Sequence, residues 1–320
     1  MSASPSVLEI RNLKVTYKLG RRQQLVAVAG ISFHIDREET LGLVGESGCG
    51  KSSVARAIMQ LPPPSYGNVL FFGEDLTRVD RKRLRQLRHR FQMIFQDSVS
   101  ALNPRRKVGL SIAVALRATD RTPRKQRDRR VREMMSTVGL DPSQFNRRPH
   151  QLSGGQCQRI QIARALMTGP KLLVCDEPVS SLDVSVQAQI LKLLEQLRTR
   201  HGLTILFISH DMAVVKNVCD RVAVMYLGKL CETAPTEALF AAPAHPYSTV
   251  LINAIPLPEN ISLRSDIRAL AAEPPSPVDP PPGCRFHTRC PLSRTRCSEM
   301  EPPIETIGPG RQVACHFPLL

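Results

Sequence analysis

The feature that most constrains this chain is a glycine-rich octapeptide at residues 45–52, Gly-Glu-Ser-Gly-Cys-Gly-Lys-Ser. The apolar run 41–44 precedes it directly, and a stretch compatible with a helix begins at Lys51. A strand, a glycine-rich loop and a helix in this order are typical of a phosphate-binding P-loop. The glycines let backbone N–H groups converge on phosphate oxygens, Lys51 adds a positive charge, and Ser52 offers a hydroxyl to Mg²⁺.

The octapeptide therefore predicts a site for a nucleoside triphosphate. The residues expected to contact the nucleotide from this segment are Gly45, Glu46, Ser47, Gly48, Cys49, Gly50, Lys51, Ser52 and Ser53.

A second group of polar residues follows the apolar run 172–175, which is typical of a buried strand. Asp176 and Glu177 come directly after this run. A P-loop ATPase needs a carboxylate at the end of a neighbouring strand to hold Mg²⁺, and a group that polarises the attacking water. We expect Asp176 to serve the metal and Glu177 to act as the general base.

A third segment, Leu-Ser-Gly-Gly-Gln at residues 152–156, precedes a helix that starts near Cys157. A hydroxyl and two glycines at a helix N-terminus form a second anion-binding surface. Two separate phosphate-facing surfaces are hard to reconcile with one nucleotide. They make sense if each surface completes the site of another subunit.

The order of elements predicts an α/β fold with a mainly parallel sheet covered on both faces. The patterning predicts strands at 8–17, 26–35, 40–44, 67–73, 90–95, 171–175, 203–208 and 221–226, and helices at 51–60, 107–118, 123–138, 154–167, 184–200 and 211–218. After Tyr226 the regularity fades. Residues 272–283 contain six prolines and are interpreted as a stiff, extended linker before a short cysteine-bearing tail.

Composition limits the classes of partner. The formal charge of +16 favours anionic partners such as nucleic acid or the inner face of a membrane. Much of the excess lies in the runs 78–90 and 117–132, which suit solvated helix faces, with lipid or partner contact as the alternative. The absence of Trp and the presence of only four Tyr weaken a base-stacking role. Neither a membrane span nor a signal peptide is predicted, so the chain is expected to stay in the cytoplasm.

The cysteines are unevenly placed. Of nine, four crowd the last 40 residues with the spacing C-x5-C-x6-C-x17-C, namely Cys284, Cys290, Cys297 and Cys315. In a reducing compartment such a cluster suggests metal ligation over disulfides. The spacing differs from the paired C-x2-C of zinc ribbons, and four thiolates suit either iron with sulfide or zinc. His287 and His316 are interpreted as surface residues.

Taken together, the motifs resemble the nucleotide-binding subunit of an ATP-binding cassette (ABC) transporter over roughly the first 250 residues. The resemblance implies a P-loop NTPase fold with a parallel-sheet core, an antiparallel β subdomain and a helical subdomain inserted at about 97–160. Domain boundaries of 1–250 and 251–320 follow, the second being a Cys-rich C-terminal extension. The residues that carry the resemblance are Tyr17, 45–52, Gln96, 152–156, Asp176, Glu177, 180–183 and His210.

Roles follow from the resemblance, position by position. Tyr17 would stack on adenine and Gln96 would ligate Mg²⁺ together with Ser52 and Asp176. His210 would contact the γ-phosphate and, with Lys51 and Glu177, complete the catalytic set. Asp183 would lie at the subunit interface, while Ser153, Gly154, Gly155 and Gln156 would reach ATP bound by the opposite subunit.

Within the family, the tail narrows the substrate. The segments 245–248, 254–256 and 283–291 resemble the C-terminal extension of oligopeptide and dipeptide importers, and with residues 156–159 they are most similar to F-type subunits of oligopeptide permeases. This resemblance implies a [4Fe–4S] cluster on the four tail cysteines, with zinc as the alternative. Nickel and glutathione importers share such an extension.

The interpretation is an ATP-hydrolysing subunit that powers oligopeptide or dipeptide import from the cytoplasmic face of the cell membrane. The resemblance also implies a second, non-identical ATPase subunit, two transmembrane permease subunits and an extracytoplasmic substrate-binding protein, with no nucleic acid. A soluble ABC ATPase acting on nucleic acid is the rival hypothesis. The single cassette, the His245-Pro-Tyr segment and the cysteine tail count against it.

Overall fold

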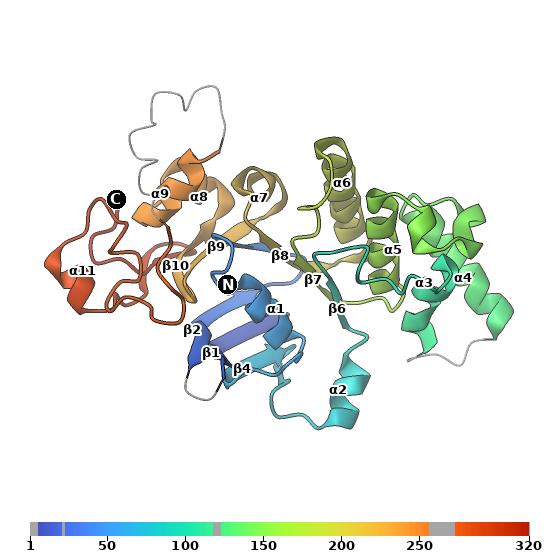
Figure 1. Ribbon diagram of the computed structural model, residues 1–320, viewed down its shortest axis with the longest axis horizontal. Coiled ribbons are helices and arrows are strands. Elements are labelled where there is room, and N and C mark those ends of the chain that lie inside the picture. The colour runs from blue at the N-terminus through green and yellow to red at the C-terminus, as the bar shows by residue number, and fades with distance from the viewer. Residues whose placement is uncertain (1–5, 21–22, 118–122, 256–272, 320) are drawn as a thin grey trace. The chain divides into compact units, whose positions relative to one another are not determined.

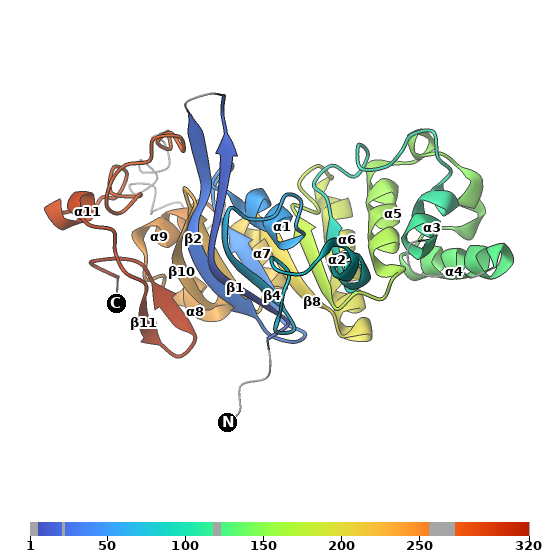
Figure 2. The same ribbon diagram turned by 90° about the horizontal axis from the view of Figure 1, so that it is seen from below.

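The computed structural model describes residues 6–20, 23–117, 123–255 and 273–319, and Figures 1 and 2 show it from two sides. The chain forms two compact units, which we describe one after the other. Unit 1 contains residues 35–38, 72–206 and the N-terminal residues up to 8, and unit 2 contains residues 9–34, 39–71 and 207–320. The P-loop belongs to unit 2, whereas the Asp176-Glu177 pair belongs to unit 1.

Unit 2 begins with the strands β1 (Leu8–Lys18), β2 (Gln24–Ile35) and β4 (Tyr66–Phe71), which lie side by side in the order β2-β1-β4 (Figures 1 and 2). The five residues of β3 (Thr40–Val44) are all buried. This strand runs parallel to β9 (Arg221–Tyr226), with Leu41 opposite Arg221 and Val44 opposite Val224. Parallel pairing brings the carboxyl ends of both strands to one edge, where the helix α1 (Lys51–Ile58) begins.

The sheet of unit 2 continues beyond β9 in the order β9, β10 (Lys229–Pro235), β12 (Arg311–Val313) and β11 (Glu305–Gly308). Each of these strands is antiparallel to the one before it. The helices α8 (Thr236–Ala241) and α9 (Pro246–Asn253) contact β10, and α11 (Thr295–Glu299) lies in the tail. The carboxylate of Glu232 on β10 is buried and accepts the backbone N–H groups of Ala244 and His245 at 2.9 Å. It thereby fixes the start of α9, where Pro246 occupies a position that needs no donor.

Unit 1 contains the parallel pair β6 (Phe91–Ile94) and β7 (Leu172–Asp176), with Phe91 opposite Leu172 and Ile94 opposite Cys175. The helices α3 (Val108–Arg117), α4 (Arg124–Thr137) and α5 (Gly154–Leu166) pack together, and α5 also contacts β6 and α6 (Val184–His201). Two 3₁₀ turns, Pro142–Asn146 and Pro149–Gln151, link α4 to α5. The α6 helix ends at Gly202, which adopts a left-handed conformation with φ of 57°.

The strand β8 (Thr204–Ser209) spans the boundary between the units, and α7 (Met212–Val218) follows it in unit 2. Asp211 accepts the N–H groups of Ala213 and Val214, so it caps α7. The short strand β5 (Glu74–Asp75) and the helix α2 (Arg81–Leu87) complete unit 1.

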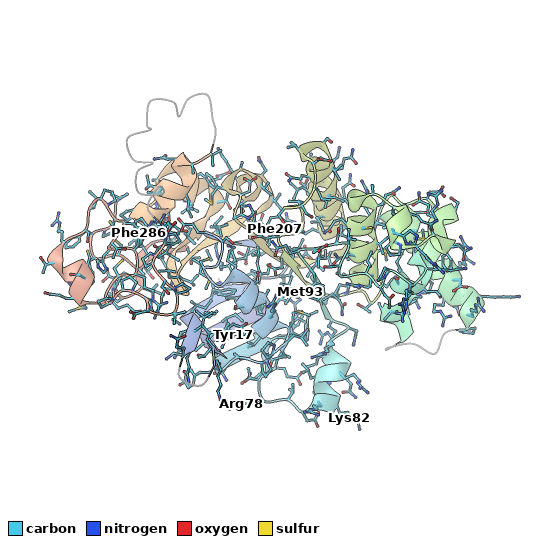
Figure 3. All side chains as sticks on the ribbon, in the orientation of Figure 1. Tyr17, Arg78, Lys82, Met93, Phe207 and Phe286 are labelled. Atoms are coloured by element: carbon cyan, nitrogen blue, oxygen red, sulfur yellow. The ribbon has the colours of Figure 1, made fainter. Side chains whose placement is uncertain are left out.

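Residues 81–87 and 124–132 of the two basic runs lie in the helices α2 and α4, and most of their charged side chains are exposed. In Figure 3, Lys82 lies on α2 at the periphery of unit 1, whereas the buried Met93 lies in its interior. Ion pairs such as Arg83 with Glu74 at 2.7 Å and Arg129 with Glu133 at 2.9 Å are solvent-exposed and contribute little to stability. In the described ranges, no helix combines the length and apolar character that crossing a bilayer requires.

The α/β class predicted from the sequence is confirmed. The expectation that regular structure fades after Tyr226 was wrong, because β10, α8, α9, α11, β11 and β12 all follow it. These elements are short, and β10 pairs with β12 although Glu232 and Val313, which lie opposite each other, are 81 positions apart in the sequence. Local periodicity carries little signal for such elements.

Candidate nucleotide-binding site

The P-loop passes very close to two neighbouring strands of unit 2. Gly45 and Gly50 have φ of 152° and 109°, values that other residues rarely adopt. A Cβ atom on Gly45 would overlap the carbonyl oxygen of Met225 in β9, and one on Gly50 would overlap that of Ala27 in β2. Glycine is therefore required at both positions by backbone conformation and by space. The loop that results is clamped between β9 and β2.

Lys51 is the first residue of α1 and is only 4% exposed. Its Nζ donates to the carbonyl oxygens of Gly45 at 2.7 Å and of Glu46 at 2.8 Å. A buried ammonium needs such acceptors, since an unpaired buried charge is strongly unfavourable. The charge predicted for phosphate binding therefore lies inside the curve of the loop. The N-terminus of α1 adds backbone donors at the same place.

Two further predicted residues belong to unit 2. Tyr17 on β1 is half-buried and its hydroxyl donates to the hydroxyl of Ser53 in α1 at 3.3 Å. The structure thus connects the residue predicted to stack on adenine with the residue after the P-loop. His210 is exposed at the carboxyl end of β8, directly before the cap of α7.

In unit 1 the structure brings together two of the predicted residues from different strands. Asp176 is the last residue of β7 and is 4% exposed, and Glu177 follows with a φ of 46°. The side-chain amide of Gln96, which comes two residues after β6, donates to Glu177 Oε2 at 2.9 Å. This contact leaves the amide oxygen of Gln96 free to accept or to ligate. The two strand ends therefore present one amide and two carboxylates.

The Ser-Gly-Gly-Gln segment caps α5 in the way that its sequence predicts. Ser153 accepts the N–H of Gln156 at 3.3 Å, and the Gln156 side chain accepts the N–H of Ser153 at 3.0 Å, a reciprocal capping box. A Cβ on Gly155 would lie 2.6 Å from the side chain of Val186 in the first turn of α6. Both helix starts therefore meet, and Asp183, the N-cap of α6, belongs to the same junction.

The four tail cysteines lie together in unit 2. The cysteines at 284, 290, 297 and 315 line one small cavity, together with His245, His287 and His316 and with apolar residues that include Phe286, Leu292 and Phe317. The interpretation of His287 and His316 as simple surface residues was therefore incomplete, because both are half-buried beside the cysteines. Burial, followed by its neighbouring cysteines, raises the pKa of the Cys284 thiol to about 11. Among the described residues, however, no three or more His, Cys, Asp or Glu side chains are arranged as the ligands of a metal ion.

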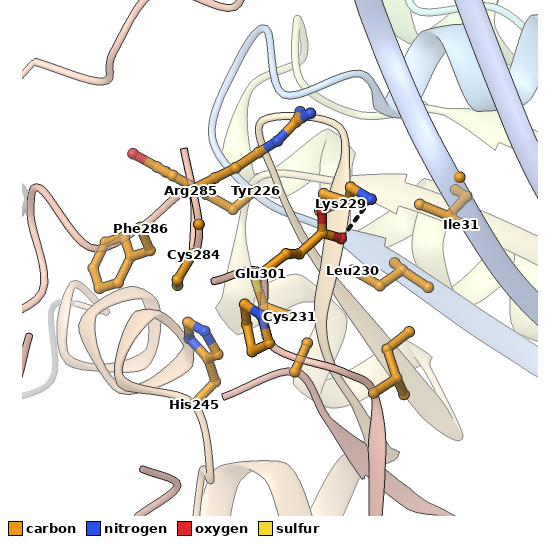
Figure 4. Close-up of a pocket in the computed structure, with 15 residues that line it drawn as sticks. Ile31, Tyr226, Lys229, Leu230, Cys231, His245, Cys284, Arg285, Phe286 and Glu301 are labelled. Carbon is orange, nitrogen blue, oxygen red and sulfur yellow. Dashed lines mark ion pairs between the residues drawn. The ribbon is translucent and has the colours of Figure 1, made fainter. Parts of the chain in front are cut away.

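A second cavity of about 60 Å³ adjoins Cys284. In Figure 4, Cys231 of β10, His245 and Phe286 surround it, and the ion pair of Lys229 with Glu301, at 2.6 Å, closes one side. Burial, and then the nearby Cys284, raises the pKa of the Cys231 thiol well above its usual range. Cys231, which is not one of the predicted metal ligands, therefore lies beside one of them as a neutral thiol.

Two family models match this chain: "ABC transporter" over residues 28–180, and "Oligopeptide/dipeptide transporter, C-terminal region" over residues 231–297. The oligopeptide transport ATP-binding protein AppF of Bacillus subtilis is 43% identical, and the alignment covers 98% of this chain and 97% of that protein. OppF of Salmonella typhimurium is 46% identical, with 93% and 92% covered. The chain belongs to the ATP-binding proteins of oligopeptide ABC transporters.

Solved structures agree with this family. The dimeric ATP-binding cassette MJ0796, bound to ADP and Pi, matches with a TM-score of 0.66 and 27% identity, covering 72% of this chain and 98% of that one. CbiO1 of Clostridium perfringens also gives a TM-score of 0.66 at 27% identity, covering 82% and 99%. The family predicted from the motifs, an ABC ATPase of peptide import with a cassette fold, is confirmed. ATP and Mg²⁺ are the cofactors expected of such an ATPase.

Two residues that sequence reasoning missed contact the P-loop. The hydroxyl of Tyr247 accepts the P-loop N–H of Glu46 at 3.0 Å. Arg289 of the tail donates two hydrogen bonds of 2.9 Å to the Glu46 carboxylate. Glu46 and Arg289 are 243 residues apart, so no local pattern in the sequence indicates their contact. The segments that contain Tyr247 and Arg289 were singled out through the family resemblance, which did not indicate a contact with the P-loop.

We predict that Gly50→Ala prevents formation of the P-loop of this ABC ATPase. The added Cβ would meet the Ala27 carbonyl, and the positive φ adds a cost of about 1 kcal/mol. We expect binding of a fluorescent ATP analogue to fall at least about tenfold, because displaced loop amides no longer converge on phosphate. Gly73→Ala is the matched control, since Gly73 has a φ of 79° but open space around its Cβ. Equal effects of the two substitutions would contradict the clamped loop.

Proposed function

We propose that this chain hydrolyses ATP at its own P-loop and carboxylate pair to drive peptide import through a membrane permease. The observation that carries the proposal is the contact of Gln96 with Glu177 at the carboxyl ends of β6 and β7, in a chain that aligns almost completely with oligopeptide transport ATP-binding proteins. A buried strand ending in two carboxylates, with one of them held by an amide, is suited to metal-assisted phosphoryl transfer.

In this proposal Glu177 accepts a proton from the attacking water, and Gln96 orients its carboxylate through the 2.9 Å hydrogen bond. The Gln96 amide oxygen, the Asp176 carboxylate and the Ser52 hydroxyl are the hard oxygen ligands that Mg²⁺ prefers. Bound Mg²⁺ would neutralise charge on the phosphates. Lys51 stabilises the charge that develops on the transferred phosphoryl group, and His210 contacts that group.

The proposal extends to a second subunit. The capped N-terminus of α5, with Ser153 and Gly155, offers backbone donors that suit the phosphates of a nucleotide on a partner. At the same junction Asp183 is exposed, and the neighbouring Val184 is an apolar side chain that is 82% exposed. The related cassette MJ0796 is dimeric with ADP and Pi bound. We infer a head-to-tail pair in which Asp183 lies at the interface, and the second ATPase is a non-identical chain.

Closure of this pair around ATP would favour one conformation of two permease subunits, and hydrolysis would reopen it. The chain would act at the cytoplasmic face of the membrane as a peripheral subunit, with peptide delivered by a binding protein on the other side. Peptide selection then belongs to those partners, and nickel or glutathione would replace peptide only if the partners select them.

Replacing Glu177 with Gln tests the catalytic assignment. We expect ATP turnover to fall by about 10² to 10⁴-fold, the contribution typical of a general base, while binding of the ATP analogue is retained. Glu195→Gln, on the exposed side of α6, is the matched control and is expected to hydrolyse ATP at the native rate. Native turnover in Glu177→Gln would show that another group serves as the base.

Co-purification tests the partners. A tagged chain extracted from membranes in mild detergent is expected to carry two multi-spanning proteins and a second ATPase, identified by mass spectrometry. ATP hydrolysis by that complex in vesicles is expected to rise with the loaded peptide-binding protein. Recovery of ribosomes or nucleic acid without a membrane protein would contradict the importer. If nickel or glutathione stimulated ATP hydrolysis and peptide did not, the imported substrate would be nickel or glutathione.

We further propose that the four tail cysteines hold an iron–sulfur cluster. Four thiols around one small cavity match the donor set of a [4Fe–4S] centre. A single tetrahedral zinc would need sulfurs about 3.8 Å apart, since each Zn–S bond is about 2.3 Å. Zinc and an iron–sulfur cluster therefore require different separations of the four sulfurs. Such a centre, when bound, would crosslink the tail; the thiols themselves must first lose their protons.

Metal analysis of the chain purified without oxygen checks this proposal. We expect about four iron ions per chain with equivalent sulfide, and visible absorbance that disappears on oxidation. Cys290→Ser is expected to lose most of the iron, whereas Cys157→Ser, at a buried thiol of α5, is expected to keep it. A content of one zinc and no iron per chain would show that the site holds zinc and no cluster. A native protein that contains no metal would refute both proposals.

A further inference from the structure

Glu46, the second residue of the P-loop, is held through three of its groups: the backbone N–H, the backbone carbonyl and the side-chain carboxylate. Its N–H donates to the Tyr247 hydroxyl at 3.0 Å. Its carbonyl oxygen accepts the ammonium of Lys51 at 2.8 Å. Its carboxylate accepts two parallel hydrogen bonds of 2.9 Å from Arg289. Two of these three contacts come from the region after residue 231 that matches the oligopeptide/dipeptide transporter C-terminal model.

Arg289 occupies an enclosed aromatic site. Its side chain is 3% exposed and that of Glu46 is 20% exposed. The guanidinium also donates to the Tyr226 hydroxyl at 3.2 Å, and its carbon lies 5.6 Å from the centroid of the Tyr226 ring and 5.9 Å from that of Phe286. Favourable cation–π contacts therefore surround a charge whose partner for a bidentate ion pair is Glu46.

The rings form one buried cluster that includes Tyr247. The centroids of Tyr226 and Tyr247 are 4.7 Å apart, and Phe286 lies 5.3 Å from Tyr226 and 5.2 Å from Tyr247. All three side chains are at most 1% exposed. Because such clusters are close-packed, Arg289 and Tyr247 cannot shift independently of each other. Glu46 therefore faces a rigid pair of hydrogen-bonding groups.

Burial of the Arg289 charge makes its ion pair with Glu46 energetically important. Burial acts to lower the pKa of Arg289, but the hydrogen bonds that its guanidinium donates to Glu46 and Tyr226 outweigh this effect and leave that pKa raised. Removing one partner of a buried ion pair leaves an uncompensated charge. The folded protein is then much less stable than with the intact pair or with two neutral groups. The ion pair with Arg289 therefore favours the observed conformation of Glu46 over others.

We propose that Arg289 and Tyr247 are positioning residues for the ATP site: the C-terminal region holds the first half of the P-loop in its phosphate-binding conformation through Glu46. The inference rests on the proposed function, since it assigns to that site a further pair of determinants. ATP affinity then depends on residues outside the matched ABC transporter region at 28–180. Neither residue touches the reacting atoms, so their effect is expected on binding more than on the chemical step.

The test measures the Kd of a fluorescent ATP analogue for the full-length chain, and the KM and kcat for ATP in the intact complex. Arg289→Met is expected to raise Kd and KM by about tenfold or more, with a smaller change in kcat, because a misplaced loop weakens every phosphate contact. Arg289→Lys keeps the charge but loses the paired geometry and is expected to give about a threefold rise. Tyr247→Phe removes the acceptor for the Glu46 N–H, and the rise in Kd and KM that it causes is expected to lie between those of the two Arg289 variants.

A double-substitution cycle separates positioning from a general loss of stability. Once Glu46→Gln has removed the carboxylate charge, adding Arg289→Met should raise Kd far less than it does in the native chain. Arg285→Met is the matched control: Arg285 lies in the same tail and donates to the Leu227 carbonyl, so its loss is expected to leave Kd unchanged. Far-ultraviolet circular dichroism of each variant reports whether it has folded.

Additive effects of Glu46→Gln and Arg289→Met in folded protein would overturn the proposal. So would an unchanged Kd in Arg289→Met, or a loss confined to kcat. These outcomes differ from failure of the proposed function, in which the unsubstituted chain itself would not bind the ATP analogue. If Arg289→Met does not fold, Arg289→Lys and Tyr247→Phe decide the question by the same split between KM and kcat.

Discussion

The structure of unit 2 depends on how closely the P-loop backbone approaches the carbonyl oxygens of β9 and β2. At Gly45 and Gly50 there is no room for a side chain, so the loop lies directly against Met225 and Ala27. Because the loop lies so close to these strands, Lys51 is buried. Its ammonium therefore needs acceptors within the protein, and the carbonyl oxygens of Gly45 and Glu46 accept its hydrogen bonds. Strand pairing, loop conformation and the placement of one cation are thus consequences of a single packing constraint.

Much of the fold could be predicted where local pattern and local chemistry agree. The strand before the loop, the helix from Lys51 and the strand ending at Asp176 have the predicted type, with ends within a few residues of the predicted ones. The helix predicted to reach residue 60 ends at Ile58, and Gln60 has a positive φ of 56° just before the proline run. The strands after Tyr226 could not be predicted, because pairing between distant segments stabilises them more than their composition does.

The candidate site shows the same division. The capping box at Ser153 and Gln156 is a local interaction whose residues are three apart, and the sequence shows it directly. The contact of Gln96 with Glu177 joins two strands 81 residues apart, and it was anticipated only as two separate roles. Tyr247 and Arg289 carry no motif that points to the P-loop, since their function depends on the folded aromatic cluster. Family resemblance identified their segments but not their partner.

The ion pair of Glu46 with Arg289 also has an evolutionary consequence. An acidic residue at this loop position and a basic residue 243 positions later are each unfavourable without the other. Removal of the tail would leave the Glu46 carboxylate without its partner, and a neutral residue at position 46 would leave the buried guanidinium of Arg289 without one. A substitution at either residue is therefore expected to be tolerated best with a matching substitution at the other, so that this part of the tail behaves as part of the nucleotide-binding unit.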